Sequence, residues 1–256
     1  MYKIIPKVIA NILKPLLPTL ISHVQARYVE GRRILDNIIQ AHGIIHTLKS
    51  QRKGGMIIQL DPVKAYAKIS RHYMEKMLEA FGFDQHWIKW IINLVSTTIF
   101  SLLVNGAPTK PFYTSRGIRQ GDPLSPFIFI LIMEGLSRSI KNTTAEGEIK
   151  GLKLFQNCST STKQQFFDDT LLHGKPTLKE AKSYKKILED LREASGHEIN
   201  HSKSMIYFFN TNPAIQRTLA NILWFERKLL PAKYLGILGQ GGHLGEHTDG
   251  AQKKIT

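Results

Sequence analysis

The sequence has little cysteine, no long apolar stretch and few acidic residues for its length. Its 256 residues include a single cysteine, Cys158, which excludes an internal disulfide and a cysteine-rich zinc site and predicts an intracellular protein, the nucleus included. The longest apolar run, Phe127 to Met133, is far shorter than the roughly 20 residues of a membrane-spanning helix. Lysines interrupt the apolar N-terminal residues, so no signal-peptide layout is present.

Basic residues outnumber acidic ones strongly. The chain has 35 Lys and Arg against 20 Asp and Glu, for a formal net charge of +15. A hydrophobic share of 42% excludes a disordered polycation, because that much apolar material can build a core. The charge therefore predicts a folded protein with a polyanionic partner. Nucleic acid is the first candidate and an anionic membrane surface the second.

Short apolar runs predict strands. Met56 to Leu60 is typical of a buried strand and ends in Asp61. Two further apolar pairs flank Asp168 and Asp169, which predicts a hairpin with both acids at its tip. Asn105-Gly106 favours a second tight hairpin, since both residues accept a positive φ.

Longer periodic segments predict helices between these strands. Ser125 followed by Pro126 is typical of an N-cap and first helical residue. Thr177 and Glu180 fit a capping box, and an apolar stripe from Leu178 to Ala194 precedes a stop at Gly196. Trp87 and Trp90 are assigned to the core. The other predicted helices lie at 36–48, 69–81, 84–97 and 125–141.

The acids at the strand ends are unusual in so basic a chain. If the strands are neighbours, Asp61, Asp168 and Asp169 meet at one sheet edge, and their mutual repulsion needs a cation. Mg²⁺ binds carboxylates together with substrate phosphates, and two such ions suit phosphoryl transfer. The alternative is structural, because Asp is common in turns, where it accepts local hydrogen bonds.

Six segments in order resemble the reverse transcriptase of non-LTR retrotransposons, in the plant long-interspersed-element style. The resemblance covers residues 2–236. The segments, from the first fingers motif through motifs A to E, are ARYVEGRRILDNIIQAH, LDPVKAY, SRGIRQGDPLSP, QFFDDTLL, SGHEINHSKS and LPAKYLG.

The resemblance implies an α+β fold, the fingers and palm of a right-hand polymerase, with an antiparallel palm sheet packed on helices. Residues 1–55 correspond to fingers, 56–240 to palm and 115–126 to the motif B junction. Residues 241–256 are expected to form a poorly ordered tail or the start of a truncated thumb. Thumb and endonuclease segments of a larger polyprotein are expected to be absent.

The implied activity is RNA-directed DNA polymerisation. Asp61, Asp168 and Asp169 would hold two Mg²⁺ ions, with Mn²⁺ as an alternative. A DNA primer's 3′-hydroxyl, paired to an RNA template, would attack the α-phosphate of a deoxynucleoside triphosphate.

The resemblance also assigns nucleotide contacts. Tyr66 would exclude a ribose 2′-hydroxyl, Gln120 and Gly121 would lie at the nascent pair, Arg32 would bind the triphosphate, and Lys203 would protonate pyrophosphate. Arg33 is an equally good candidate for binding the triphosphate. Ordinary packing, loop or surface roles remain the alternatives for all of these residues.

Three residues depart from the family pattern: Pro62, Ala67 in place of an aspartate, and Phe167 in place of a small residue. Pro62 removes a backbone donor at a strand end. Phe167 either crowds the primer terminus or packs into the core. A catalytically inactive nucleic-acid-binding remnant of the same fold is therefore the second functional hypothesis.

Overall fold

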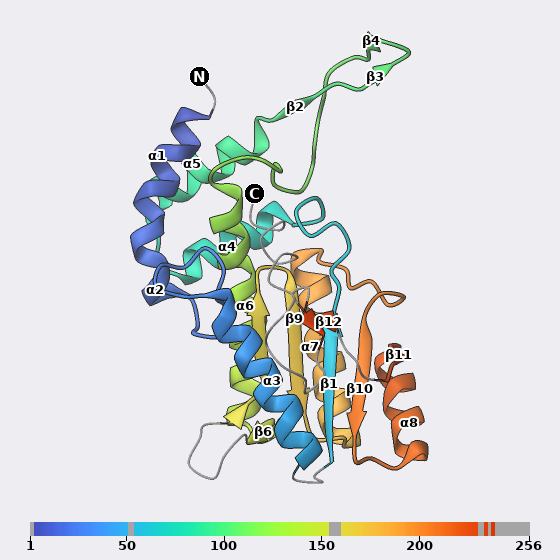
Figure 1. Ribbon diagram of the computed structural model, residues 1–256. Helices are drawn as coiled ribbons and strands as arrows, with labels where there is room; N and C mark the ends of the chain where they lie inside the picture. The colour runs from blue at the N-terminus through green and yellow to red at the C-terminus, as the bar shows by residue number, and fades with distance from the viewer. Residues whose placement is uncertain (1–2, 51–53, 154–159, 230–232, 235–236, 239–256) are drawn as a thin grey trace.

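The computed structural model describes residues 3–50, 54–153, 160–229, 233–234 and 237–238. Cys158, most of LPAKYLG and the expected tail at 241–256 lie outside the described residues. A central sheet lies between helices on both faces, further helices lie beyond one end of it, and a slender arm projects from them (Figure 1). The predicted mixture of helices and a mainly antiparallel sheet is confirmed.

The central sheet has five strands in the order β11, β10, β1, β9, β8. Neighbouring strands are antiparallel, except that β10 and β11 are parallel. The predicted buried strand is confirmed as the middle strand. The bounds are β1 (Gly55–Leu60), β8 (Lys163–Phe166), β9 (Asp169–Gly174), β10 (Met205–Phe209) and β11 (Glu226–Arg227).

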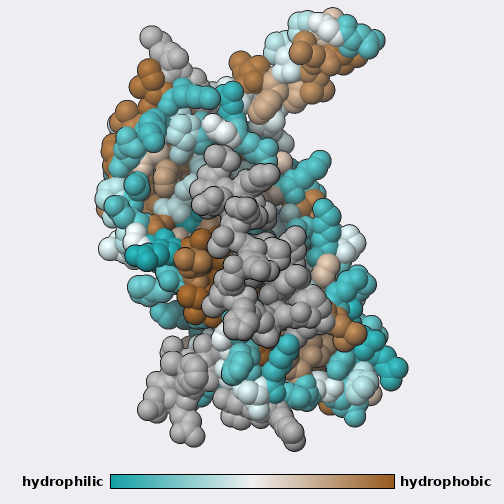
Figure 2. Space-filling view, viewed as in Figure 1, coloured by the Kyte–Doolittle hydropathy of each residue, from teal (hydrophilic) through white to brown (hydrophobic). Residues whose placement is uncertain are grey.

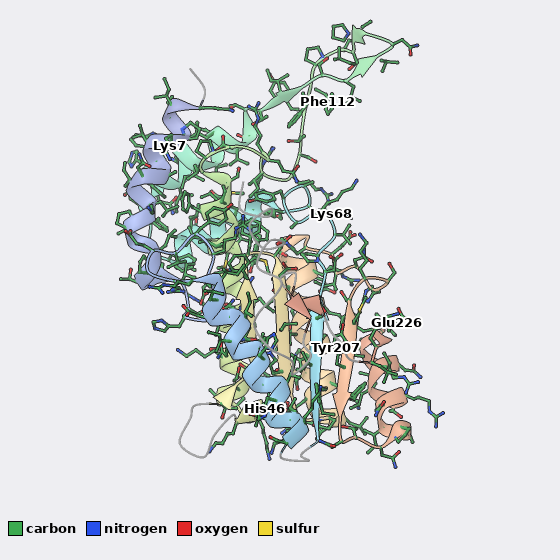
Figure 3. The ribbon with its side chains drawn as sticks, viewed as in Figure 1. Lys7, His46, Lys68, Phe112, Tyr207 and Glu226 are labelled. Atoms are coloured by element: carbon green, nitrogen blue, oxygen red, sulfur yellow. The ribbon has the colours of Figure 1, made fainter. Side chains whose placement is uncertain are left out.

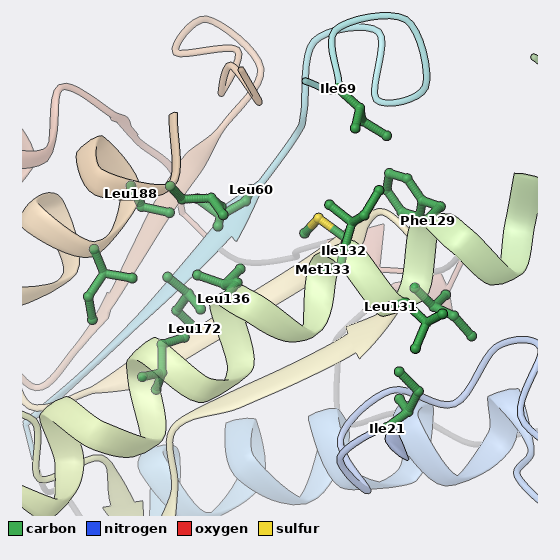
Figure 4. Close-up of a cluster of buried hydrophobic side chains, with 14 of the residues drawn as sticks. Ile21, Leu60, Ile69, Phe129, Leu131, Ile132, Met133, Leu136, Leu172 and Leu188 are labelled. Carbon is green, nitrogen blue, oxygen red and sulfur yellow. The ribbon is translucent and has the colours of Figure 1, made fainter. Parts of the chain in front are cut away.

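The sheet separates two hydrophobic cores. Met56, Ile58 and Leu60 of β1 join the larger core, together with residues of α6 (Ser125–Ala145) and α7 (Leu178–Ser195). Ile57 points the other way, into a smaller core with α3 (Ile34–Ser50). Figure 4 shows Leu136 of α6 close to Leu172 of β9 and Leu60 of β1. Burial on both faces explains why β1 carries apolar residues on both faces rather than alternating.

Further helices continue the larger core beyond the end of the sheet. Trp87 stacks on Phe83 at a ring-centroid distance of 4.9 Å, as predicted for a core residue. Trp90 is 61% exposed, so its assignment to the core was wrong. The bounds are α1 (Ile4–Leu13), η1 (Lys14–Leu16), α2 (Leu17–Leu20), α4 (Arg71–Ala80), α5 (Gln85–Ser96) and, beside β10, α8 (Pro213–Leu223).

The ends of α6 and α7 follow the predicted caps in part. Ser125 is the first residue of α6 rather than its N-cap, which is Leu124. Thr177 caps α7 by accepting a hydrogen bond from the Glu180 amide, and Gly196 ends the helix at φ 75°. Leu178 is 52% exposed and Ala194 is also exposed, so the buried stripe is shorter than predicted.

The predicted Asn105-Gly106 hairpin forms the tip of the projecting arm. Asn105 and Gly106 have φ values of 50° and 81°, as a tight turn between β3 (Leu103–Val104) and β4 (Ala107–Pro108) requires. At the base, β2 (Ile99–Phe100) pairs with β5 (Phe112–Tyr113). Figure 2 shows hydrophobic residues on the arm's surface, and Figure 3 labels Phe112 there.

Two further small strand pairs complete the described elements. β6 (Leu152–Lys153) pairs with β7 (Thr160–Ser161), and β12 (Lys233–Tyr234) pairs with β13 (Ile237–Leu238). Within the described ranges, no helix has the length and apolar character that crossing a membrane requires.

Leu172 on β9 tests the larger core, because its side chain is fully buried. We expect Leu172→Ala to lower the free energy of unfolding by about 2–5 kcal/mol, through lost burial and the cavity left behind. Leu103→Ala on the arm, where the side chain is 75% exposed, should change it by less than about 0.5 kcal/mol. Urea unfolding of both variants measures the difference, and equal losses would contradict this core assignment.

Candidate functional site

The register of the sheet brings Asp61 and Asp169 to one edge. Leu60, the last residue of β1, pairs with Thr170 of β9, and Asp61 and Asp169 lie one residue further along these antiparallel strands. Phe166 pairs with Asp169, so Phe167 and Asp168 form the two-residue turn of the β8–β9 hairpin. The predicted hairpin is confirmed, with Asp168 in its turn and Asp169 at the start of a strand.

The loop before β10 reaches the same edge. The backbone amide of Asp61 donates to the Ser204 hydroxyl at 3.0 Å, and the Asn200 amide donates to the Asp61 carbonyl at 2.8 Å. Lys203 lies in this loop with an exposed side chain. The fold therefore places the predicted lysine in a loop bonded directly to the backbone of Asp61.

Pro62 does not disturb the strand end. It forms an antiparallel bridge with Ile199, and the Val63 amide donates to the Glu198 carbonyl at 2.8 Å. The hydrogen bonds of this pairing come from Asp61 and Val63, on either side of Pro62. The missing proline N–H therefore costs no bond at this position.

The loops carrying Tyr66 and Gln120 are bonded together. The Ile118 amide donates to the Tyr66 carbonyl, and the Gly117 amide donates to the Ile69 carbonyl, both at 2.8 Å. Gly117 has φ 84°, and a Cβ there would lie 2.7 Å from the Ala67 carbonyl oxygen. A glycine is required here both by conformation and by close approach.

Gln120 and Gly121 follow in the same loop and are exposed. Gly121 has φ 77°, and no atom lies within 4 Å of the position a Cβ would occupy. The space beside this residue is therefore open, and its positive φ favours glycine.

Phe167 packs into an aromatic cluster. Its ring centroid lies 4.6 Å from Phe129, 5.6 Å from Tyr66 and 5.5 Å from Tyr28, and Tyr66 itself stacks on Phe129. The sequence left open whether this ring crowds the site or packs into the core. The structure shows it packed against the larger core.

Burial sets the ionisation of two residues in contact with this cluster. The pKa of Tyr66 is raised by burial first, and then by the nearby Tyr28 hydroxyl and the charge of Asp168. His197 lies against Phe129, and burial lowers its pKa to about 4. Both side chains are therefore neutral at pH 7, and Asp168 lies close enough for its charge to act on Tyr66.

Residues 1–238 match the family model described as reverse transcriptase (RNA-dependent DNA polymerase). The chain belongs to the reverse transcriptase family. It is 26% identical over 238 residues to a transposon TX1 protein of Xenopus laevis, covering 92% of this chain and 18% of that protein. It is 28% identical to the Pol polyprotein of a type-1 retrotransposable element R2 from Popillia japonica, covering 54% of this chain and 22% of the polyprotein.

Two other comparisons bear on length and fold. An uncharacterized mitochondrial protein of Arabidopsis thaliana is 34% identical over 111 residues, which are 43% of this chain and 90% of that protein. Apo telomerase from Candida tropicalis superposes with a TM-score of 0.57 at 11% identity, over 81% of this chain and 41% of the telomerase chain. The likeness to telomerase concerns the fold alone. This reverse transcriptase chain spans less than a quarter of the length of the transposon TX1 and R2 proteins.

The side chain of Arg32 is bonded to the backbone of the segment that precedes it. Its two terminal guanidinium nitrogens donate to the carbonyls of Pro18, Ile21, Ser22 and Gln25, and burial lowers its pKa. These bonds fix the loop after α2. They also occupy the two terminal guanidinium nitrogens with which Arg32 was predicted to bind the triphosphate. Arg33, the other residue that the sequence offers for triphosphate binding, is exposed.

Gln25 is a residue that sequence reasoning missed. Its side-chain oxygen accepts from the Phe167 amide at 2.8 Å, and its nitrogen donates to the Phe167 carbonyl at 3.3 Å. Phe167 has φ 62°, which is strained for a bulky residue. The buried Gln25 thus holds the strained turn beside Asp168. Its partner lies 142 residues away, and no local pattern marks such a pair.

The described residues contain no group of three or more His, Cys, Asp and Glu side chains arranged to hold a metal ion. Asp61 and Asp169 are next to each other by register, and Asp168 lies in the adjoining turn. Carboxylates are the donors that Mg²⁺ takes, commonly one or two of them completed by substrate phosphates and water. The donor chemistry at this edge therefore fits a magnesium site that is completed by substrate.

A substitution at Gly117 tests the close approach of the loops that carry Tyr66 and Gln120. Gly117→Ala and Gly147→Ala both place a Cβ on a glycine of positive φ, but Gly147 has no atom within 4 Å. We expect Gly117→Ala to lose at least about 1 kcal/mol more stability in urea unfolding, because only it also meets a carbonyl. Equal losses would mean that backbone strain alone explains the glycine.

A substitution at Gln25 tests whether this side chain supports the β8–β9 turn. We expect Gln25→Met to lower unfolding stability by about 1–3 kcal/mol, because it removes the partner of the Phe167 amide and one of the two side-chain donors to the Phe167 carbonyl, the other being Gln165. Amide hydrogen exchange at Phe167 should accelerate. Gln85→Met, at an exposed position on α5, is the control, and unchanged exchange at Phe167 in Gln25→Met would refute the role.

Proposed function

We propose that this chain is the catalytic core of a non-LTR retrotransposon reverse transcriptase and extends a DNA primer along an RNA template. One observation carries the proposal. In a member of the reverse transcriptase family, the strand register brings Asp61 and Asp169 to a sheet edge where Asp168 occupies the adjoining turn. Three acids gathered in a chain of net charge +15 favour phosphoryl transfer over a structural turn.

The reaction is attack of the primer 3′-hydroxyl on the α-phosphate of a deoxynucleoside triphosphate, with pyrophosphate leaving. Asp61, Asp168 and Asp169 would bind Mg²⁺ or Mn²⁺. Two such ions, when bound, stabilise the attacking and leaving oxygens. The carboxylates of this chain then fix the position of the reacting groups, and positioning with electrostatic stabilisation supplies most of the catalysis.

The remaining site residues serve the nucleotide. Tyr66 is held by its stack on Phe129 at 5.2 Å, which suits a rigid wall against a ribose 2′-hydroxyl. Gln120 and Gly121 are exposed on the neighbouring loop and would contact the nascent base pair. Lys203, exposed on the loop bonded to Asp61, would donate a proton to the leaving pyrophosphate.

The finer assignments follow from the family resemblance. We assign residues 56–240 to the palm, 1–55 to the fingers and 115–126 to their junction. The first 55 residues include α3, which packs on the sheet through the smaller core, so this part of the fingers would rest directly on the palm. A plant element is the proposed origin, and the match to an Arabidopsis protein agrees with it.

The test is primer extension on an RNA template with Mg²⁺ and deoxynucleoside triphosphates. We expect incorporation by the wild type and a loss of at least about 10³-fold with Asp168→Asn plus Asp169→Asn, because the carboxylates that would hold the cations at the reacting phosphate are lost. Template binding should survive, since it depends on basic residues.

The matched control combines Asp84→Asn, at the exposed N-cap of α5, with Asp190→Asn, at an exposed position on α7. It should retain activity, because Asn also caps a helix. Wild-type protein that binds template but incorporates nothing would refute the catalytic proposal. It would instead support a non-catalytic nucleic-acid binder of the same fold.

A further inference from the structure

Two cavities lie beside the small strand β7. One, of about 520 Å³, is lined by Thr47, Lys150, Lys153, Thr160 and Lys175 among others. The second, of about 590 Å³, is lined by loop 18–24, the C-terminal half of α6 and residues 160, 162 and 163. Thr160 lines both, so the two cavities adjoin.

The first cavity is basic. Lys150, Lys153 and Lys175 are exposed, and the residues lining the cavity include no acid. Among the described residues, none forms a hydrogen bond or an ion pair with any of these three ammonium groups. Glu180 lies behind the cavity, 2% exposed, and its carboxylate accepts from the backbone amides of Lys150 and Lys175. Its charge reaches Lys175, but its oxygens are already bonded.

Basic residues line the second cavity as well. Arg138 and Lys141 line it from α6, and Thr19, Thr144 and Thr162 line it as well. The hydroxyls of Thr19 and Thr144 already donate to the carbonyls of Leu16 and Ile140. Arg138 lies over the ring of Phe81 at 4.4 Å, which orients its guanidinium without neutralising it. The one acid of the lining, Glu134, is 5% exposed and accepts two hydrogen bonds from Ser22.

The first cavity is distinct from the candidate catalytic edge. Gly54 and Lys175, in the lining of the first cavity, lie just before β1 and just after β9, whereas Asp61 and Asp169 lie at the opposite ends of these strands. Seven residues of extended chain separate Gly54 from Asp61, which is roughly 20 Å at the rise of a strand.

We propose that the two cavities form a second nucleic-acid contact, which binds the phosphodiester backbone of an RNA strand. Flexible lysines and an arginine are groups that contact phosphates without reading bases. Two adjoining cavities suit a chain of phosphates better than a single phosphate. The apolar lining residues Leu48 and Leu152 are buried, so no apolar side chain of the first cavity is free to enter a membrane.

The inference rests on the proposed function for the choice of RNA as the polyanion. Its test therefore uses binding without catalysis. Fluorescence anisotropy of a labelled single-stranded RNA is measured across a salt series in EDTA, with Asp168→Asn plus Asp169→Asn in every protein. Lys150→Ala, Lys153→Ala and Lys175→Ala are combined in one variant. Lys7→Ala, Lys89→Ala and Lys186→Ala, at exposed helical positions, remove the same charge elsewhere.

We plot the logarithm of the association constant for the RNA against the logarithm of the salt concentration. We expect the cavity variant to reduce the steepness of this plot by about 2, because each of the three lost lysine–phosphate contacts to a single strand contributes roughly 0.7. The control should leave the slope nearly unchanged. Adding Arg138→Ala and Lys141→Ala should lower it by about one more.

Equal slopes for the cavity variant and the control would overturn the inference. So would cavity-dependent binding to phosphatidylserine vesicles with no cavity-dependent binding to RNA. If the cavity variant behaves as expected but the wild type fails in primer extension, the proposed function fails and this second contact stands.

Discussion

The register of β1 between β9 and β10 is the constraint on which the rest of the structure depends. β1 is buried on both faces, and its neighbouring residues Ile57 and Ile58 point into different cores. A slip of one residue would exchange the two faces and move every side chain to the wrong core. The same register sets Asp61 beside Asp169 and the Ser204 loop beside Asp61. Core packing therefore fixes the positions of charged residues that take no part in the packing.

The hairpin turn at this edge depends on packing in another way. Phe167 adopts a backbone conformation that glycine would take without strain. The conformation persists because Gln25 bonds both its amide and its carbonyl, and because its ring contacts Phe129, Tyr66 and Tyr28. Strain is held at such positions only where the surroundings over-determine it. Here the held residue directly precedes Asp168, so the carboxylate stands on a supported turn.

The charge of the chain is distributed according to the same geometry. The three acids lie at one end of the central strands. Lys150, Lys153 and Lys175, which have no ion pair within the part of the chain that the structure describes, line a cavity at the other end. A polyanion that meets both ends would be drawn to the basic cavities by charge, while the acidic edge would bind the phosphates under reaction only together with cations. The family, established for residues 1–238, makes a nucleic acid the natural polyanion.

Several features were determined by the sequence alone. Apolar runs predicted β1 and the β8–β9 hairpin, Asn105-Gly106 predicted a tight turn, and Thr177 and Gly196 predicted the ends of α7, because each depends on neighbours in the chain. The order of six motifs predicted the family, which the family model confirmed. Local pattern could not decide what depends on distant contacts. Trp90 lies on the outer side of its helix, and Pro62 falls where its strand needs no donor. Gln25 supports a turn 142 residues away, and only the folding of the whole chain brings the two together.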